Sequence, residues 1–360
     1  MASKCVAKEK ESSSKKQKTK DQQLEDDFEL DTDDDEAVCF FQDIDLLQNQ
    51  GINMADVNKL KSAGIFTLKG IQMTTRKRLS AIKGMSDAKV DKIKEAVNKL
   101  SPDSEIINGL QVMEKRKRVF KIQTGSEELN KLLGGGVESM AITEAFGEFR
   151  TGKTQLSHTL CVTCQLPTET FAGGKAIFVD TENTFRPDRI REIAQRFNID
   201  SEKALENVSY VRAFSSEHQA EILDKVAAKF YDDGGSFKLI IVDSIMALFR
   251  VDYSGRGELS ERQQKLGQFL SKLQKISEEY NVAIFGTNQM TADPGATMSF
   301  QADPKKPIGG HVLAHASTVR IALRKGRGDN RIAKIYDAPD LPEAEATFAI
   351  SSGGVVDAKD

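Results

Sequence analysis

Cysteine is scarce in this chain, and apolar residues nowhere form a long run. Four cysteines in 360 residues are too few for a disulfide framework. Cys161 and Cys164 have the spacing of a redox pair or half a zinc site, but without a second pair we expect both to be buried small residues. No apolar stretch is long enough to span a bilayer, and the first residues lack the apolar segment of a secretory signal. We therefore expect a soluble, intracellular protein without membrane contacts.

The formal net charge is only −3, and this average hides a strong asymmetry at the start of the chain. Residues 4–20 are rich in lysine and serine, whereas residues 21–36 are rich in Asp and Glu and contain no Lys or Arg. Neither half carries enough apolar surface to fold, so residues 1–36 are predicted to be a disordered tail. The lysine run at 15–20 is typical of either a nuclear-import signal or a solvated flexible segment.

Residues 37–100 are predicted to form a small helical domain, because apolar side chains recur there at helical spacing. Within it, residues 82–89 have the pattern of a helix, a glycine turn and a second helix capped by Ser86. Such a helix-hairpin-helix presents backbone N–H groups to a DNA phosphate, with Lys83 and Lys89 adding positive charge. An ordinary helical turn in a protein-binding domain is the alternative.

A polar stretch containing Pro102 predicts a linker over residues 101–118. In the remaining residues, 119–360, short β-rich runs alternate with amphipathic helical patterns. The expected strands are 176–180, 239–243, 282–287 and 319–323, and the expected helices are 186–197, 217–231 and 260–280. This alternation predicts an α/β domain with a mostly parallel sheet and helices on both sides.

One short segment of this domain has the spacing of a phosphate-binding loop. It reads Gly147-Glu148-Phe149-Arg150-Thr151-Gly152-Lys153-Thr154. Its glycines let consecutive N–H groups point at a phosphate. Lys153 supplies positive charge to the β- and γ-phosphate oxygens, and Thr154 offers its hydroxyl to Mg²⁺. A chance glycine turn is the alternative.

Polar residues at the ends of three expected strands support a nucleotide site. Asp243 ends a fully apolar strand, where a carboxylate can hold Mg²⁺ opposite Thr154. Glu182 follows a second strand and can polarise the water that attacks a γ-phosphate, although capping the next helix is an alternative role. Gln289 follows a third strand and can sense the γ-phosphate through its amide. The sequence therefore predicts an ATPase that uses ATP and Mg²⁺.

Two irregular segments begin at the ends of strands that carry this site. The first, residues 251–258, contains Tyr253 and Arg256. The second, residues 290–311, is too long for a passive connector. Its candidate nucleic-acid contacts are Lys305, Lys306, Gly309 and Gly310. Such loops predict either contacts to a nucleic-acid backbone that ATP controls, or a substrate lid.

Segments 138–162, 180–189, 244–266 and 288–337 resemble the eukaryotic RecA-like homologous recombinases, and the resemblance spans nearly everything after about residue 51. Two runs resemble the meiosis-specific branch: Glu138-Ser139-Met140-Ala141-Ile142-Thr143-Glu144-Ala145 and Met290-Thr291-Ala292-Asp293-Pro294-Gly295-Ala296-Thr297-Met298. The resemblance implies a RecA-like core that forms filaments or rings on single-stranded DNA and exchanges strands with homologous duplex DNA in the nucleus. It also implies ATP with Mg²⁺, or Ca²⁺ in its place, and recombination accessory proteins as partners.

The resemblance implies nucleotide-site roles for individual residues. Glu182 corresponds to the catalytic glutamate, Gln289 to the γ-phosphate sensor and Arg189 to an adenine contact. His315 and the segment from Asp337 to Pro342 correspond to groups that complete the ATP site of a neighbouring subunit. Each site is then shared between two copies of the chain.

The resemblance also implies DNA contacts in the two irregular segments. Arg250 and Arg256 correspond to phosphate contacts of the first DNA loop. Pro294 stands in the second loop where an apolar wedge separates base triplets, which can stretch DNA by offsetting lost stacking.

The linker departs from the family pattern. Family members join subunits through Phe-x-x-Ala, which adds a strand to the neighbour's sheet and places two side chains in pockets. Here the equivalent stretch begins with Ile106 and ends with Gly109. Either the receiving pocket has changed to match, or the subunit contacts are weaker than is usual for the family.

We therefore predict a DNA-dependent ATPase that acts as a meiotic strand-exchange recombinase. A mediator of the same family that loads another recombinase is one alternative, and Glu182, Gln289 and the two loops argue against it. A ring-shaped DNA motor or a metabolite kinase on the same core are others. Neither explains the amino-terminal hairpin or the two basic loops.

Overall fold

The computed structural model describes residues 41–102, 106–168, 171–255, 257–292 and 305–359. The predicted tail lies outside these residues, as do two candidate DNA contacts, Arg256 and Pro294. In the described part of the chain, no helix is long and apolar enough to cross a membrane.

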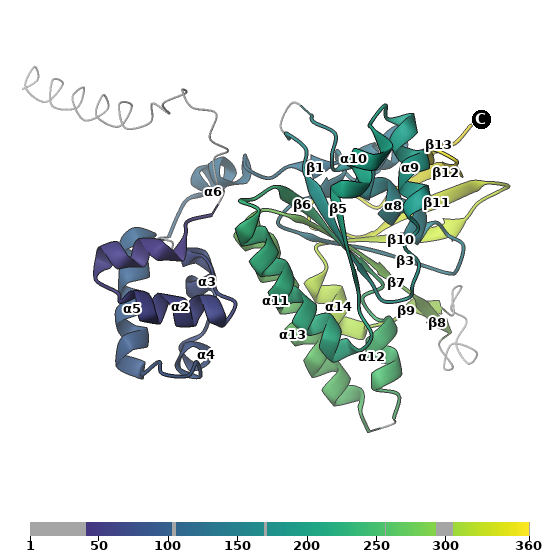
Figure 1. The fold of residues 1–360 in the computed structure, drawn as a ribbon. Coiled ribbons are helices and arrows are strands. Elements are labelled where there is room, and N and C mark those ends of the chain that lie inside the picture. The colour runs from purple at the N-terminus through teal and green to yellow at the C-terminus, as the bar shows by residue number, and fades with distance from the viewer. Residues whose placement is uncertain (1–40, 103–105, 169–170, 256, 293–304, 360) are drawn as a thin grey trace, which may run out of the picture. The chain divides into compact units, whose positions relative to one another are not determined.

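Short helices form the small domain before residue 101 (Figure 1). They are η2 (Ile44–Gln50), α2 (Met54–Ser62), α3 (Leu68–Gln72), α4 (Arg76–Ser80) and α5 (Asp87–Leu100). Leu47, Leu60 and Val97 belong to their shared apolar core. Gly84, with a φ of +81°, lies in the turn between α4 and α5. Ser86 holds the N-cap position of α5, as predicted, but its side chain makes no capping hydrogen bond; its backbone carbonyl accepts the N–H groups of Lys89 and Val90.

A nine-stranded sheet is the centre of the larger domain. Its strands are β3 (Ile142–Gly147), β4 (Lys175–Asp180), β5 (Val208–Arg212), β6 (Phe237–Asp243), β7 (Ala283–Asn288), β10 (Val319–Lys325), β11 (Asn330–Asp337), β12 (Glu345–Ser351) and β13 (Gly354–Asp357). Their order is β13-β12-β11-β10-β3-β7-β6-β4-β5. All pairs from β10 to β5 are parallel, and those from β10 to β13 are antiparallel. The mostly parallel sheet predicted from the sequence is confirmed.

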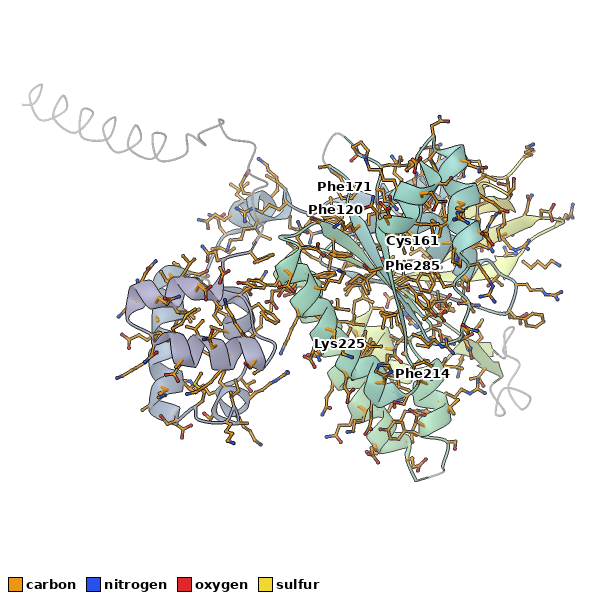
Figure 2. The ribbon with its side chains drawn as sticks, in the orientation of Figure 1. Phe120, Cys161, Phe171, Phe214, Lys225 and Phe285 are labelled. Atoms are coloured by element: carbon orange, nitrogen blue, oxygen red, sulfur yellow. The ribbon has the colours of Figure 1, made fainter. Side chains whose placement is uncertain are left out.

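Helices pack on both faces of this sheet (Figure 1). One face carries α7 (Glu127–Leu132), α8 (Lys153–Thr163), α9 (Pro187–Arg196) and α10 (Ser201–Glu206). The other carries α11 (Ser216–Asp232), α12 (Ala247–Asp252), α13 (Leu259–Tyr280) and α14 (Gly310–Ala316). Successive side chains of a strand point to opposite faces, so Phe178 joins the first core and Val179 the second. Cys161 lies in the first core together with Phe285 (Figure 2), and both Cys161 and Cys164 are buried free thiols, as expected.

Several regions contain elements that the sequence analysis did not expect. The linker contains α6 (Gly109–Arg116), which begins with a capping box made by Asn108 and Gln111. Short strands β1 (Lys121–Ile122) and β2 (Val137–Glu138) pair before the sheet. The segment predicted as one irregular loop begins with β8 (Met290–Ala292), returns as β9 (Lys305–Pro307) antiparallel to it, and continues into α14. The domain boundaries at residues 36, 100 and 118 stay predictions.

Candidate nucleotide site

The phosphate loop joins the end of β3 to the start of α8. Gly152 precedes α8 with a φ of +103°, a conformation that favours glycine. At Gly147, an added Cβ would lie 2.3 Å from the carbonyl oxygen of Leu323, so a side chain is sterically excluded there. The loop therefore has the strand-to-helix context that a phosphate-binding motif requires, with the positive end of the α8 dipole at the loop.

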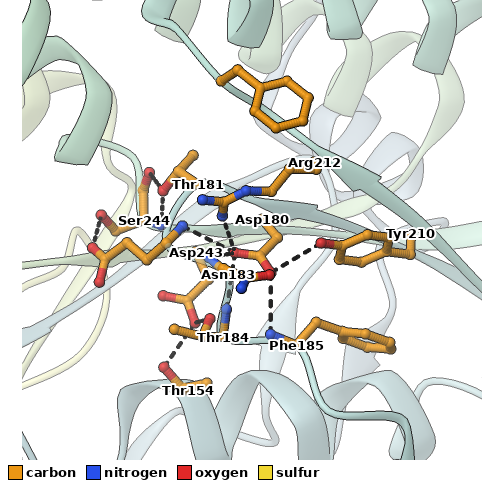
Figure 3. A network of polar contacts seen from close by, with 12 residues as sticks. Thr154, Asp180, Thr181, Asn183, Thr184, Phe185, Tyr210, Arg212, Asp243 and Ser244 are labelled. Atoms are coloured by element: carbon orange, nitrogen blue, oxygen red, sulfur yellow. Dashed lines mark hydrogen bonds and ion pairs between the residues drawn. The ribbon is translucent and has the colours of Figure 1, made fainter.

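Thr154 and Asp243 lie in direct contact (Figure 3). The Thr154 hydroxyl donates to Asp243 Oδ2 at 2.8 Å, Thr184 donates to the same oxygen at 3.2 Å, and Thr287 donates to Oδ1. Burial raises the pKa of the Asp243 carboxyl, and the three hydroxyl donors oppose that rise. A carboxylate beside a threonine hydroxyl is an oxygen ligand set that suits Mg²⁺.

Glu182 and Gln289 are also in contact. Gln289 Nε2 donates to Glu182 Oε1 at 2.7 Å, and the Ser244 hydroxyl donates to the same oxygen at 2.9 Å. The three residues follow β4, β7 and β6, which are neighbours in the sheet. Because carboxyl ends of parallel strands meet at one edge, residues 107 positions apart in sequence share one hydrogen bond here.

A cavity of about 600 Å³ contains these groups. It is lined by the loop 147–154 and by Gln155, Glu182, Asp243, Ser244, Thr287, Gln289, Met290 and Thr291. Lys153 Nζ donates to the carbonyl oxygens of Gly147 and Glu148, both at 2.7 Å. Burial lowers the pKa of Lys153, against the pull of the nearby carboxylates. The close backbone approach at Gly147, the half-buried Lys153 cation and the Thr154 and Asp243 oxygens together fit a nucleoside triphosphate with Mg²⁺.

Comparison with known proteins decides the family. The Rad51 family model matches residues 115–358. The chain belongs to the Rad51 family. A second family model, the SAM-like helix-hairpin-helix tandem, matches residues 43–99. The predicted RecA-like core with a helix-hairpin-helix domain before it is therefore confirmed.

Whole-length relatives agree with this family assignment. The chain is 72% identical over 329 residues to the "Meiotic recombination protein DMC1/LIM15 homolog" of Mus musculus, covering 91% of this chain and 96% of the relative. The protein of the same name from Homo sapiens is 71% identical over 327 residues, with 91% and 96% covered. The "Meiotic recombination protein DMC1 homolog" of Lilium longiflorum is 58% identical over 328 residues, with 91% and 93% covered. The predicted resemblance to meiotic recombinases is confirmed.

Two buried residues beside this Rad51-family site were missed in the sequence analysis. Asp180 ends β4 with no exposed surface and accepts hydrogen bonds from the loop that carries Glu182. His158 on α8 contacts the Thr154 carbonyl oxygen through Nδ1 at 2.7 Å and accepts the Arg186 N–H through Nε2 at 3.0 Å. Burial lowers the pKa of His158, which favours this neutral form. The position of Asp180 at a strand end was the available signal.

A buried ion pair lies beside the same strands. Arg320 Nε is 2.7 Å from Glu144 Oε2, and Asn288 Nδ2 donates to Glu144 Oε1 at 2.8 Å. Asn288 Nδ2 also donates to the carbonyl oxygen of Ile308, at 2.6 Å. Glu144 thus connects β3, which leads into the phosphate loop, with Asn288 at the end of β7, and Asn288 in turn contacts Ile308 beyond β9.

Other predicted nucleotide contacts lie outside the cavity lining. Arg189 Nε donates to Gln155 Oε1 at 2.8 Å, and Gln155 itself lines the cavity. His315 on α14 lines a different cavity, Asp337 ends β11, and Pro342 follows that strand. The adenine contact and the contacts to a neighbouring subunit stay predictions.

The candidate DNA contacts are distributed over several elements. They are Arg250 on α12, Tyr253 just after it, Lys305 and Lys306 on β9, Gly309 and Gly310 at the start of α14, and Lys83 and Lys89 near the α4–α5 turn. Lys89 Nζ pairs with Asp56 at 2.9 Å, and Tyr253 packs partly against the second core. The β8–β9 pairing brings the two ends of one predicted DNA loop together.

The two predicted linker contacts differ in environment. Ile106 is fully exposed, with a relative accessibility of 103%. Gly109 is the first residue of α6, and a Cβ added there would meet no atom within 4 Å. An exposed isoleucine before a helix suits a contact with another subunit, and this role stays a prediction.

Proposed function

We propose that this chain is an ATP-dependent meiotic recombinase that forms filaments on single-stranded DNA and exchanges strands with homologous duplex DNA. The relatives support the proposal, since their names describe meiotic recombination proteins. The observation that carries it is the contact between Glu182 and Gln289 in the phosphate-loop cavity, with Gln289 joined directly to β8. Action on chromosomal DNA in the nucleus, with accessory recombination proteins, belongs to the same proposal.

In the proposed ATPase reaction, Lys153 and the backbone N–H groups of the loop bind the β- and γ-phosphates. Thr154 and Asp243 would hold Mg²⁺, which would supply positive charge to offset that of the phosphates. Glu182 accepts a proton from the water that attacks the γ-phosphorus, the bond from that phosphorus to the bridging oxygen breaks, and ADP and phosphate leave. Ser244 and Gln289 orient the Glu182 carboxylate for this proton transfer.

Nucleotide state would control DNA binding through Gln289. This residue connects β7 to β8, and β8 pairs with β9, which carries Lys305 and Lys306. Gln289 is bonded directly to Met290, the first residue of β8. A change in Gln289 on loss of the γ-phosphate would therefore pass to β8 and, through strand pairing, to the lysines of β9. Arg250 and Tyr253 would contact the DNA backbone from the other loop.

Assembly would use β5, one of the two edge strands of the sheet. β5 is the last strand in the sheet order, and such an edge can accept a strand from another chain. Beside it lies an open cavity of about 330 Å³ whose lining includes Ile177, Val211, Ile222 and Val226. We infer that this apolar surface receives Ile106 from a neighbouring subunit.

A strand-exchange assay tests the proposed function. Purified full-length protein is incubated with circular single-stranded DNA, ATP, Mg²⁺ or Ca²⁺, and a linear duplex that is either homologous or unrelated. We expect joint molecules only with the homologous duplex. A mediator would yield product only with another recombinase added, a motor would unwind the duplex without homology, and either result would refute the proposal.

A further inference from the structure

Asp180 connects the loop that carries Glu182 to the edge strand β5. We propose that Asp180 is a positioning residue for Glu182, and that Tyr210 and Arg212 on β5 hold Asp180 in place. The inference rests on the ATPase function proposed above, because it assigns a supporting role to the same carboxylate.

The inner contacts of Asp180 fix the backbone of the Glu182 loop. Asp180 Oδ1 accepts the N–H groups of Glu182, Asn183 and Thr184 at 3.0, 2.6 and 3.2 Å. Asp180 Oδ2 accepts the N–H group of Phe185 at 3.1 Å (Figure 3). Asn183 is left-handed, with a φ of +62°, which curls the chain around the carboxylate. Four consecutive N–H groups on one buried carboxylate form an anion-binding nest inside the protein.

This nest determines where the Glu182 side chain begins. Glu182 has its backbone N–H on Asp180 and its carboxylate on Ser244 and Gln289. Both ends of the side chain are therefore held. A displacement of about 1 Å in a reacting group can lower a rate about 100-fold, so the loop geometry bears directly on proton transfer.

The outer contacts of Asp180 come from β5. Arg212 Nη1 lies 2.9 Å from Asp180 Oδ1, and the Tyr210 hydroxyl donates to Oδ2 at 3.3 Å. The Tyr210 ring also packs against the Phe185 ring, with centroids 5.1 Å apart. Tyr210 is 46% exposed and the Arg212 side chain 27%. These partners can therefore be changed without opening a cavity in the core.

Three variants test the proposal: Asp180→Asn, Tyr210→Phe and Arg212→Gln. We expect kcat for DNA-stimulated ATP hydrolysis to fall about 10- to 100-fold in the first and about 3- to 10-fold in the other two. The Kd for the non-hydrolysable analogue AMP-PNP with Mg²⁺ should stay within about 3-fold, since the phosphate loop is untouched. Asp188→Asn and Arg191→Gln are matched controls, because they alter an exposed acid–base pair on α9, and they should keep the wild-type kcat.

Epistasis with Glu182 separates positioning from general destabilisation. In a Glu182→Gln background, Tyr210→Phe and Arg212→Gln should cause no further loss of the residual rate. The inference is overturned if both variants keep the wild-type kcat, if they weaken AMP-PNP binding as much as they slow turnover, or if their effect persists without Glu182. Should Asp180→Asn not fold, the two β5 variants alone decide. A wild-type protein that does not hydrolyse ATP would instead refute the proposed function.

Discussion

Replacing Arg320 with Met should destabilise the large domain by about 3–5 kcal/mol, because it leaves the Glu144 carboxylate buried without its ionic partner. Glu144 has no exposed surface and Arg320 is 6% exposed. After the change, Asn288 Nδ2 at 2.8 Å and the Ser317 hydroxyl at 3.3 Å still donate to Glu144. Both donors are neutral, so they do not balance the charge. Loss of the guanidinium from the Phe146 and Tyr336 rings adds a smaller cost, about 0.5–2 kcal/mol.

A double-mutant cycle isolates the charge effect from the packing effect. Glu144→Gln keeps an oxygen acceptor for Asn288 but leaves Arg320 as an unpaired buried cation, so it should also cost about 3–5 kcal/mol. The double variant contains no buried charge at this position. We expect it to be at least about 2 kcal/mol more stable than the sum of the single effects implies.

Thermal unfolding measures this cycle. For a domain of 150–250 residues, 1 kcal/mol corresponds to about 2–4 °C in Tm, so Arg320→Met should lower Tm by about 6–20 °C. Arg324→Met is the matched control, because Arg324 pairs with Glu345 at 2.8 Å on the exposed side of the sheet and should cost less than about 1 kcal/mol. A single-variant loss below about 1 kcal/mol, or strict additivity in the cycle, would refute the reasoning.

Three further outcomes are expected. Lys153→Ala removes the half-buried phosphate-loop cation, so ATP hydrolysis should fall at least about 100-fold. Single-stranded DNA affinity, measured by fluorescence anisotropy, should lose its ATP dependence; an unchanged ATP dependence would contradict the coupling. Gly147→Ala places a methyl group 2.3 Å from a backbone carbonyl and should cost more than about 2 kcal/mol of unfolding free energy in urea, whereas Gly257→Ala, with no atom within 4 Å of the new Cβ, should be nearly neutral. Burial lowers the pKa of His158 below its usual value of 6.5, so the unfolded state binds the proton more readily and the stability that neutral His158 contributes is present above about pH 6.5 and lost as pH falls. On lowering the pH from about 7.5 to about 5, Tm should therefore fall less in His158→Gln than in the wild type, and equal slopes would exclude this role.

The sequence predicted the parallel part of the fold well because its signals are local. An apolar run ending in a carboxylate, as at Asp243, marks a buried strand within a few residues. The helix α6 was missed although its capping box at Asn108 is also local, since the surrounding stretch had the composition of a linker. The β8–β9 pair was missed for another reason: its partners Ala292 and Lys305 are separated by a long segment, and pairing over such a distance leaves no periodic pattern.

Local patterns in the sequence were enough to predict the groups of the proposed chemistry. Lys153 and Thr154 lie in one contiguous loop, and Glu182 and Gln289 each follow an apolar strand, so residue type and spacing alone led to the prediction of their roles. The three-dimensional arrangement was needed to show that Ser244 and Gln289 both donate to Glu182 Oε1, and that Asp180 links the Glu182 loop to β5. Those contacts join residues between 30 and 107 positions apart, and they depend on the order of the strands, which local patterning does not encode.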